Sequence, residues 1–497
     1  MQLRSAILRL YAKQVHKTIQ KDAKNAVSDQ QKWLSKIIQS GKNTQFGKDH
    51  KLVNVSNHTA YSSQVPIRGY EELRPYIDDI LAGKSDILWK GIPKYLAKTS
   101  GTTSGVKYLP ISHESIKFHI RTASKALFSY LHMTGEDLFS GKVIFISGSP
   151  TLIQKASIPC GRLSGIVNHE IPRWLQSNQL PSYATNTIKD WEEKLDKIVD
   201  ETMNEDLRLI SGIPPWVQMY YEKLLEKTGK DSISDIFPNL KVFAYGGVNY
   251  APYRSAIDKL HGRQVPSIET YPASEGFIAY QNDYRHPSLL LNTNAGMFYE
   301  FVPLQEINDP SPNRLTLSQV ELDKDYAILL TTNAGLWCYN IGDTIRFTSL
   351  NPYKVIVSGR IKHFISAFGE HVIGKEVEEA MQIVADRFQI GIHEFTVAPQ
   401  VSPPEGGLPY HEWFVESDGR IENIKEVEQA LDVEIVRQNL YYEDLIVGNV
   451  LRPLKIRQVV SGGFRQYMQS IGKLGGQNKV PRLKNDRSLV DKLTILS

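Results

Sequence analysis

KTSGTTSGVKYL, residues 98 to 109, is the stretch around which the rest of the chain is organised. Two glycines, Gly101 and Gly105, let the backbone bend so that successive N–H groups converge on an anion. Lys107 adds a positive charge beside them. Hydroxyl side chains supply further hydrogen-bond donors, and they belong to Thr99, Ser100, Thr102, Thr103 and Ser104. The stretch therefore predicts a loop that binds phosphate.

This loop differs from the P-loop of common nucleotide hydrolases. In a P-loop a lysine and then a Ser or Thr follow the last glycine directly, whereas here Val106 intervenes and Tyr108 follows the lysine. A flexible surface turn is the alternative interpretation, because Ser, Thr and Gly are typical of turns. The choice depends on what the rest of the chain carries.

Length and composition indicate an ordinary globular protein. The chain has 497 residues, which predicts two domains or one large domain with a smaller appendage, and it is 41% hydrophobic and 23% charged with a net charge of +4. This small charge does not favour nucleic acid or membrane as partners. Cys160 and Cys338 are too few for a disulfide framework or a cysteine-built zinc site. Without an apolar run long enough for a membrane span or a signal-peptide core, we expect a cytoplasmic protein.

The first half of the chain alternates short apolar runs with amphipathic stretches. The apolar runs are residues 142–147, 207–211 and 241–247, and the helical stretches lie around 186–204, 216–228 and 252–261. This order is typical of parallel strands joined by crossover helices, in which ligands gather at the carboxyl ends of the strands.

From about residue 296 to 358 the pattern changes to closely spaced strands, which predicts an antiparallel sheet or a small barrel. The expected strands are FYEFVP, RLTLSQVE, YAILLTT, LWCYNI, TIRFTS and KVIVSG. A helix at 374–388, the strand HEWFVES and a helix at 422–438 follow. The expected fold is α/β: a large N-terminal domain, residues 1–359, with mixed sheets flanked by helices and a β-barrel-like part, and a small mobile α+β domain, residues 360–497.

Two stretches place carboxylates after predicted strands. In TYPASEGF, residues 270–277, Glu275 is suited to Mg²⁺ and stands close to Tyr271 and small residues that a planar ring can lie against. A strand-to-helix turn with a solvated glutamate is the alternative. In YNIGDTIRF, residues 339–347, Asp343 is suited to the two hydroxyls of a ribose. A structural Gly-Asp hairpin turn is the alternative there.

Two further stretches carry cations. VSGRIKHFISAFGEHV, residues 357–372, puts Arg360 and Lys362 at the expected domain boundary, where they form either a charged linker or a hinge that touches a nucleotide. LGGQNKVPRL, residues 474–483, contains Lys479, either in a basic tail or on a mobile segment that reaches a site from the second domain.

Aromatic and small residues follow two of the predicted strands, in GIPPW at 212–216 and YGGVNYAPY at 245–253. They are suited to wall a flat apolar acid, and core packing is an equal alternative. The candidate substrate-binding residues are Trp216, Gly246, Gly247 and Tyr250.

Taken together and in this order, the five chemistry-bearing stretches resemble the adenylate-forming superfamily. Within it the chain is similar to the auxin-responsive acyl acid-amido synthetases, the plant hormone-conjugating enzymes and their bacterial relatives. The resemblance is carried by TSGTTSGVKYLPIS, ETYPASEGF and YNIGDTIRF, and it covers nearly the whole chain. Pro-Ala-Ser-Glu in the second motif, and Asn340 with Ile341 in the third, favour a bacterial-type branch.

The resemblance implies a ligase that uses ATP and Mg²⁺ to convert a carboxylic acid to an acyl-adenylate and then joins the acyl group to an amino acid, releasing AMP and pyrophosphate. An acyl-CoA ligase and a nucleotide-binding protein without catalysis are the alternatives. A monomer or small homo-oligomer is expected, with no nucleic-acid or membrane partner.

The resemblance also implies a role for each candidate residue. The implied catalytic residues are Lys107, Lys479 and Glu275, and Glu275 is also the metal ligand. Residues 100–104 with Lys107 hold the β- and γ-phosphates, Tyr271, Ala273 and Ser274 line the adenine site, Asp343 takes the ribose, and Arg360 and Lys362 form the hinge.

Overall fold

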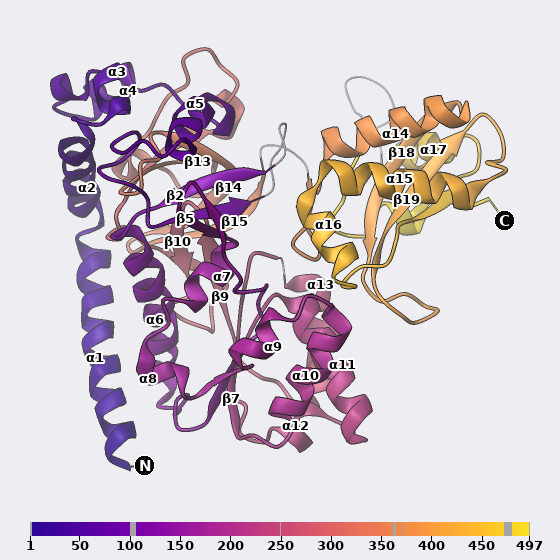
Figure 1. Cartoon of the computed structure of the whole chain (residues 1–497), viewed down its shortest axis with the longest axis horizontal. Helices are drawn as coiled ribbons and strands as arrows, with labels where there is room; N and C mark the ends of the chain where they lie inside the picture. Colours follow the sequence, from indigo (N-terminus) through magenta and orange to yellow (C-terminus); the bar gives the residue numbers. More distant parts are fainter. Residues whose placement is uncertain are drawn as a thin grey trace.

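The computed structural model describes residues 2–99, 106–248, 250–360, 364–370, 372–471 and 480–496. Figure 1 shows a larger lobe that holds the N-terminal two thirds of the chain and a smaller lobe, coloured orange to yellow, that holds the C-terminal part. Among the described helices, none combines the length and the apolarity that crossing a bilayer requires.

Helices at the N-terminus cover one side of the large lobe. α1 (Gln2–Lys24) packs along α6 (Ser115–Thr134), with Ala12 and Ile19 buried between them. α2 (Ala26–Gly41) lies against strand β12 (Met297–Pro303). The short helices that follow are α3 (Gln45–Asp49), α4 (His58–Gln64) and α5 (Tyr70–Leu81).

An eleven-stranded sheet forms the centre of the large lobe, in the order β12-β13-β14-β15-β11-β10-β9-β8-β7-β3-β6. Its parallel half consists of β6 (Gln179–Leu180), β3 (Lys142–Phe145), β7 (Leu207–Ser211), β8 (Val242–Gly246) and β9 (Ser267–Ala273). The intervening helices are α7 (Leu163–Asn168), α8 (Arg173–Gln176), α9 (Tyr183–Thr187), α10 (Trp191–Thr202), α11 (Pro214–Thr228), α12 (Ile233–Ile236) and α13 (Ala251–His261). The predicted alternation of parallel strands and helices is therefore confirmed.

The antiparallel half continues the same sheet. It consists of β10 (Gly276–Tyr280), β11 (Leu289–Leu291), β12, β13 (Asp325–Thr332), β14 (Tyr339–Leu350) and β15 (Tyr353–Arg360). Of the two arrangements expected for residues 296–358, an antiparallel sheet is the one observed.

Three of the expected strands differ from the structure. RLTLSQVE forms a short 3₁₀ helix at Leu317–Gln319, because Thr316 and Gln319 bond to each other as a capping box, and only Leu315 bridges to Phe301. LWCYNI and TIRFTS are not separate strands, since β14 runs from Tyr339 through Asp343 to Leu350.

A separate four-stranded sheet carries the opening stretch. Its order is β2-β1-β5-β4, with β1 (Tyr95–Thr99), β2 (Lys107–Ile111), β5 (Ile158–Gly161) and β4 (Ile153–Lys155). β1 and β2 are antiparallel, and their last described pair is Thr99 opposite Lys107. The glycine-rich stretch therefore connects the two strands of a β-hairpin.

The small lobe packs helices on a three-stranded sheet, β18 (Ile392–Gln400), β19 (Tyr410–Ser417) and β20 (Lys455–Gln458). Its helices are α14 (Gly374–Phe388), α15 (Ile424–Gln438), α16 (Leu440–Val447) and α17 (Gly463–Ser470). The expected helices at 374–388 and 422–438 and the strand at 411–417 are confirmed, whereas β18, α16 and β20 were not predicted. β15 ends at Arg360, and the domain boundary placed there stays a prediction.

Candidate active site

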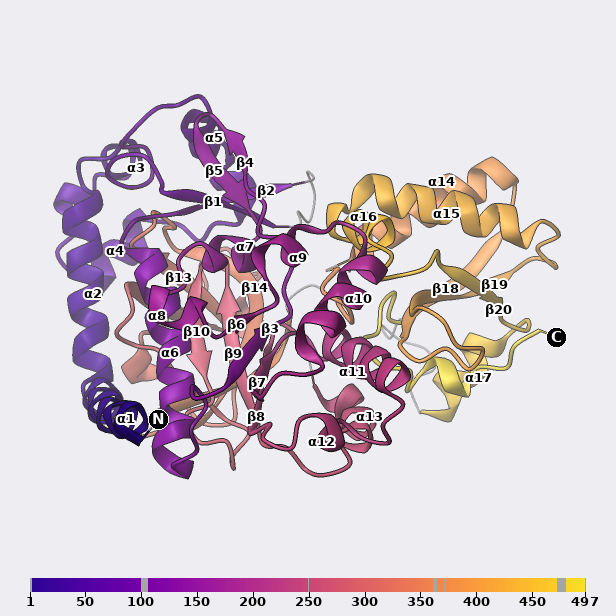
Figure 2. The same cartoon turned by 60° about the horizontal axis from the view of Figure 1, so that its bottom comes forward.

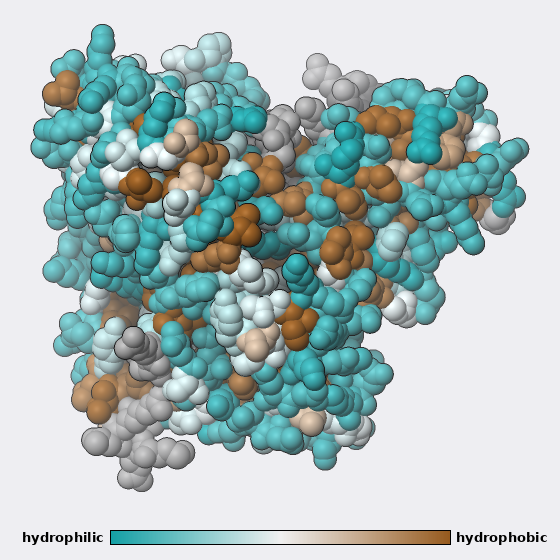
Figure 3. All heavy atoms as spheres, in the orientation of Figure 1, coloured by the Kyte–Doolittle hydropathy of each residue, from teal (hydrophilic) through white to brown (hydrophobic). Residues whose placement is uncertain are grey.

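The candidate site lies where the large lobe meets helix α16 of the small lobe. Figure 2 shows α16 beside the β1–β2 hairpin and α10. The hydrogen bonds agree, because Tyr441 Oη donates to the Lys98 carbonyl at 2.7 Å and Trp191 N donates to the Gly448 carbonyl at 2.6 Å. Figure 3 shows a largely hydrophilic surface on which several hydrophobic patches lie close to this junction.

The two ends of the glycine-rich loop are held by strands β1 and β2. Lys107 begins β2 with its Nζ 5.7 Å from the centre of the Tyr70 ring, and the next residue, Tyr108, donates its backbone N–H to Tyr70 Oη at 2.9 Å. Tyr70, the first residue of α5, thereby fixes the start of β2. Ser100, Gly101, Thr102, Thr103 and Ser104 lie outside the described residues, so their assignment to phosphate stays a prediction.

Glu275 lies in a tight turn between two antiparallel strands. Ala273 ends β9 and pairs with Gly276, which starts β10, so Ser274 and Glu275 form the turn. This corrects the alternative of a strand-to-helix turn. A Cβ at Gly276 would lie 2.1 Å from Met297 Sδ, so the buried Met297 side chain would have to move to admit any larger residue here. The side chains of Tyr271, Ala273, Ser274 and Glu275 are half-buried on this hairpin.

The structure brings together two predicted residues that lie 72 positions apart. Tyr271 Oη donates a hydrogen bond to Asp343 Oδ2 at 2.5 Å, and Asp343 is only 6% exposed. Asp343 lies within an irregularity in the pairing of β13 with β14, between the paired residues Asn340 and Thr344, and Gly342 beside it has a φ of +84°. An extra-residue irregularity of this kind re-aims a side chain out of the regular strand alternation. A tyrosine hydroxyl thus holds the Asp343 carboxylate in place.

Of the three cationic residues predicted at the hinge and near the C-terminus, the structure describes only the backbone of Arg360. The backbone of Arg360 lies opposite Asp343 in the β14–β15 pair. Lys362 and Lys479 lie outside the described residues. Their assigned roles at the hinge and the reaction centre stay predictions.

The four candidate acyl-pocket residues lie at the carboxyl ends of β7 and β8, as predicted. Trp216 and Tyr250 are buried, with Trp216 packed on Trp191 at a ring distance of 4.9 Å and Tyr250 on Tyr245 at 4.7 Å. Gly246 ends β8, and a Cβ there would lie 2.4 Å from the carbonyl oxygen of Thr270. Gly247 has a φ of +78°. Packing therefore accounts for these residues in part, and acid binding stays a prediction.

Sequence patterns did not single out three side chains beside this site. Arg162, Tyr441 and Asp444 meet between the lobes, with the Arg162 guanidinium 4.4 Å from the Tyr441 ring centre and its Nη2 2.6 Å from Asp444 Oδ2. Burial raises the pKa of Tyr441, and the charge of Arg162 and a hydrogen bond with Thr99 oppose that rise. The negative charge of Glu275 adds to it, so Glu275 also lies within electrostatic reach of this cluster.

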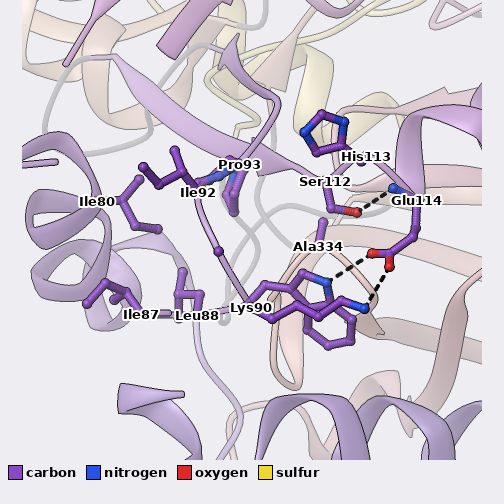
Figure 4. A pocket seen from close by; sticks show the side chains of 13 residues that line it. Ile80, Ile87, Leu88, Lys90, Ile92, Pro93, Ser112, His113, Glu114 and Ala334 are labelled. Carbon is purple, nitrogen blue, oxygen red and sulfur yellow. Dashed lines mark hydrogen bonds and ion pairs between the residues drawn. The ribbon is translucent and has the colours of Figure 1, made fainter. Parts of the chain in front are cut away.

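A small cavity of about 110 Å³ lies elsewhere in the large lobe (Figure 4). Apolar side chains such as Ile80 and Ile87 form one wall. On another, Glu114 accepts hydrogen bonds from Trp89 Nε1 at 3.2 Å and Lys90 Nζ at 2.8 Å. The predicted site residues do not line this cavity, and Trp89, Lys90 and Glu114 on its polar wall are already bonded to one another.

Within the described residues, His, Cys, Asp and Glu side chains form no group of three or more that would hold a metal ion. Mg²⁺ in nucleotide sites is commonly held by one or two carboxylates together with phosphate oxygens and water. A single half-buried carboxylate such as Glu275, within electrostatic reach of Tyr441, fits that mode of binding.

Family models match the chain along most of its length. The GH3 family N-terminal domain matches residues 15–155 and 133–266, the GH3 family central domain matches 290–360, and the GH3 family C-terminal domain matches 375–488.

Individual proteins are also similar to this chain, and each match covers nearly the whole of both sequences. A jasmonoyl--L-amino acid synthetase GH3.5 from Oryza sativa subsp. japonica is 22% identical over 93% of this chain and 93% of its own. An indole-3-acetic acid-amido synthetase GH3.4 from Arabidopsis thaliana is 24% identical over 94% of this chain and 90% of its own. The solved structure of AtGH3.15 acyl acid amido synthetase in complex with 2,4-DB has the same fold, with a TM-score of 0.64, 16% identity and coverage of 98% of this chain and 96% of that chain.

Proposed function

The chain belongs to the GH3 family, and from this premise we propose that it is an acyl acid-amido synthetase. It uses ATP to activate a carboxylic acid as an acyl-adenylate and conjugates the acyl group to an amino acid. The observation that carries the proposal is the hydrogen bond of 2.5 Å from Tyr271 Oη to Asp343 Oδ2, since Tyr271 belongs to the β9–β10 hairpin whose turn contains Glu275. The named relatives, which conjugate jasmonoyl and indole-3-acetic acid groups, support the class of reaction.

The first half-reaction joins two anions and therefore needs charge neutralisation and alignment. A carboxylate oxygen of the acid attacks the α-phosphorus of ATP, and the bond to the bridging oxygen of pyrophosphate breaks. Lys107, at the start of β2, is placed to offset charge on the β- and γ-phosphates. The Asp343 carboxylate, held by Tyr271, accepts hydrogen bonds from the ribose hydroxyls. Mg²⁺, held through Glu275, supplies further neutralisation when it is bound with ATP.

In the second half-reaction the neutral amine of the amino acid attacks the acyl carbonyl carbon. The bond to the AMP oxygen breaks, and the amine loses a proton as the amide forms. The chain from residue 360 onward is the mobile domain of this proposal, with Arg360 and Lys362 at its hinge and Lys479 approaching the reaction centre in one orientation. The protein works in the cytoplasm as a monomer or small homo-oligomer.

The decisive experiment mixes the purified protein with ATP, Mg²⁺, a panel of aryl and fatty acids, and either amino acids or coenzyme A. Acid-dependent exchange of labelled pyrophosphate into ATP, followed by an amide product, is expected. Thioester as the sole product would replace the proposal with an acyl-CoA ligase. No exchange with any acid would contradict adenylation altogether.

A further inference from the structure

Arg162 occupies a position in the large lobe next to the glycine-rich hairpin. β5 runs parallel to β1 with Gly161 opposite Ala97, so Arg162 leaves the sheet beside Lys98. Its side chain is 25% exposed. On the large lobe its backbone carbonyl accepts a hydrogen bond from Ile166 N at 3.0 Å at the start of α7, and its Cδ passes close to Gly148, 3.5 Å from where a Cβ on that glycine would lie. The guanidinium itself faces the small lobe.

Within the described residues, the Arg162 guanidinium contacts two side chains of the small lobe, and both belong to helix α16. Asp444 accepts its hydrogen bond at 2.6 Å, and the Tyr441 ring lies 4.4 Å from the guanidinium carbon. Tyr441 in turn reaches the Lys98 carbonyl at 2.7 Å. These contacts bring three parts of the structure together: the Arg162 guanidinium, the Lys98 end of the hairpin, and helix α16.

Arg162 and Asp444 form a partly exposed ion pair between a guanidinium and a carboxylate, and such pairs contribute little to stability by themselves. A guanidinium presents a planar fork of donors that matches phosphate as well as carboxylate. ATP bound against the β1–β2 hairpin would bring three phosphates to the same space with more charge than one aspartate carries. Phosphate oxygens of ATP can therefore replace the Asp444 carboxylate as the partner of the Arg162 guanidinium.

We infer that Arg162 is a polyphosphate-binding residue, and that Asp444 of the small lobe occupies its guanidinium in the orientation seen here. The inference rests on the proposed function, in which ATP binds at the hairpin. When ATP binds, Arg162 exchanges the Asp444 carboxylate for phosphate oxygens, and α16 loses one of its attachments to the large lobe. Nucleotide binding and this attachment of the small lobe therefore oppose each other, and each weakens the other by the same factor.

The test measures binding of the non-hydrolysable analogue α,β-methylene ATP with Mg²⁺ by calorimetry, on the full chain. In Arg162→Gln the dissociation constant should rise about tenfold, as expected for loss of one charge-assisted hydrogen-bonded contact to phosphate. In Asp444→Asn it should fall about two- to fivefold, because the competing carboxylate is removed. Arg208→Gln is the matched control, since Arg208 pairs with Asp206 at 2.8 Å at the opposite end of the parallel strands and should leave binding unchanged.

The sign of the Asp444→Asn effect is decisive. If Arg162 and Asp444 only tie the lobes together, both variants will change nucleotide affinity in the same direction, and the inference is overturned. Unchanged affinity in Arg162→Gln overturns it as well. If Arg162→Gln does not fold, tighter binding by Asp444→Asn supports the inference, and unchanged or weaker binding refutes it. Acid-dependent pyrophosphate exchange by the wild-type protein is recorded in parallel, and its absence counts against the proposed function alone.

Discussion

At the scale of single residues, side chains of the candidate site hydrogen-bond to one another. Asp343 is buried in the middle of a strand, where an isolated carboxylate would be costly, and the Tyr271 hydroxyl satisfies one of its oxygens. The alternative of an ordinary Gly-Asp hairpin turn is excluded, because β14 continues past Asp343 to Leu350. A buried acceptor that a tyrosine holds in one orientation is suited to bind hydroxyl groups.

Asp343→Ala should lower the kcat/KM for ATP in pyrophosphate exchange about ten- to hundredfold, because hydrogen bonds to a charged acceptor are lost. Tyr271→Phe should lower it less, about threefold to tenfold, since the carboxylate stays but loses its fixed orientation. Tyr130→Phe, whose hydroxyl bonds to the distant Lys241 carbonyl, is the control. Full exchange activity in Asp343→Ala would contradict the ribose assignment.

At the scale of elements, close packing and helix caps explain residues whose chemistry alone is ambiguous. Gly246 lies where β8 approaches β9 so closely that a methyl group would lie 2.4 Å from the Thr270 carbonyl oxygen.

Glu376 and Asn439 form a cap that joins two helices of the small lobe. Glu376 Oε2 accepts hydrogen bonds from Ile373 N at 2.9 Å, at the start of α14, and from Asn439 Nδ2 at 3.0 Å, at the start of α16.

Gly246→Ala should destabilise the protein by about 1 to 3 kcal/mol, because β8 and β9 must separate to admit the methyl group. Gly374→Ala is the control, since a Cβ there meets nothing within 4 Å. Chemical denaturation of both variants measures the difference. If Gly246→Ala and Gly374→Ala are equally stable, the β8–β9 contact is not tight. Acid binding would then be the remaining explanation for a glycine at position 246.

The Glu376 cap predicts a pH dependence of stability. Burial raises the pKa of Glu376 from 4.5 to about 7. Because the folded pKa lies above the unfolded one, stability from this group is fully present below pH 4.5 and is lost as the pH rises to about 7.

Glu376→Gln keeps an amide oxygen for both bonds and has no charge to bury. It should therefore be more stable than wild type by about 3 kcal/mol at pH 8 and by only about 1 kcal/mol at pH 5. Thermal unfolding at the two pH values tests this, with the exposed Glu379→Gln on the same helix as control. A stability difference that does not change with pH would contradict the assignment.

At the scale of the whole molecule, contacts from several elements attach the small lobe to the large one. Besides α16, the segment before α14 packs on α13, where Tyr253 Oη donates to the Ala367 carbonyl at 2.8 Å in a buried environment. Asn449 Nδ2 donates to Asp190 Oδ2 at 2.7 Å at the exposed margin. The hydrophobic core of the small lobe continues through Ala367 and Phe368 into that of the large lobe.

Tyr253→Phe should destabilise the protein by about 1 kcal/mol, because a buried carbonyl loses this donor while packing is unchanged. Thermal unfolding measures the loss, and Tyr183→Phe, on an exposed side chain, is the control. Because the tyrosine ties the lobes together, amide formation in Tyr253→Phe should change relative to pyrophosphate exchange. Unaltered stability and an unaltered ratio would show that this contact does not hold the lobes.

The amino-acid sequence by itself determined the fold class, the family and the alternation of parallel strands with helices, because these depend on local hydrophobic period and on motifs that are contiguous in the chain. LRLIS became β7 and residues 374–388 became α14, since each period is complete within its own segment. Tertiary structure alone decided that β12 to β15 join the parallel strands in one sheet, that Tyr271 holds Asp343, and that Arg162 meets Asp444 from 282 positions away. Such pairs leave no periodic signal, because strand register and lobe docking bring together residues that are polar, solitary and remote in sequence.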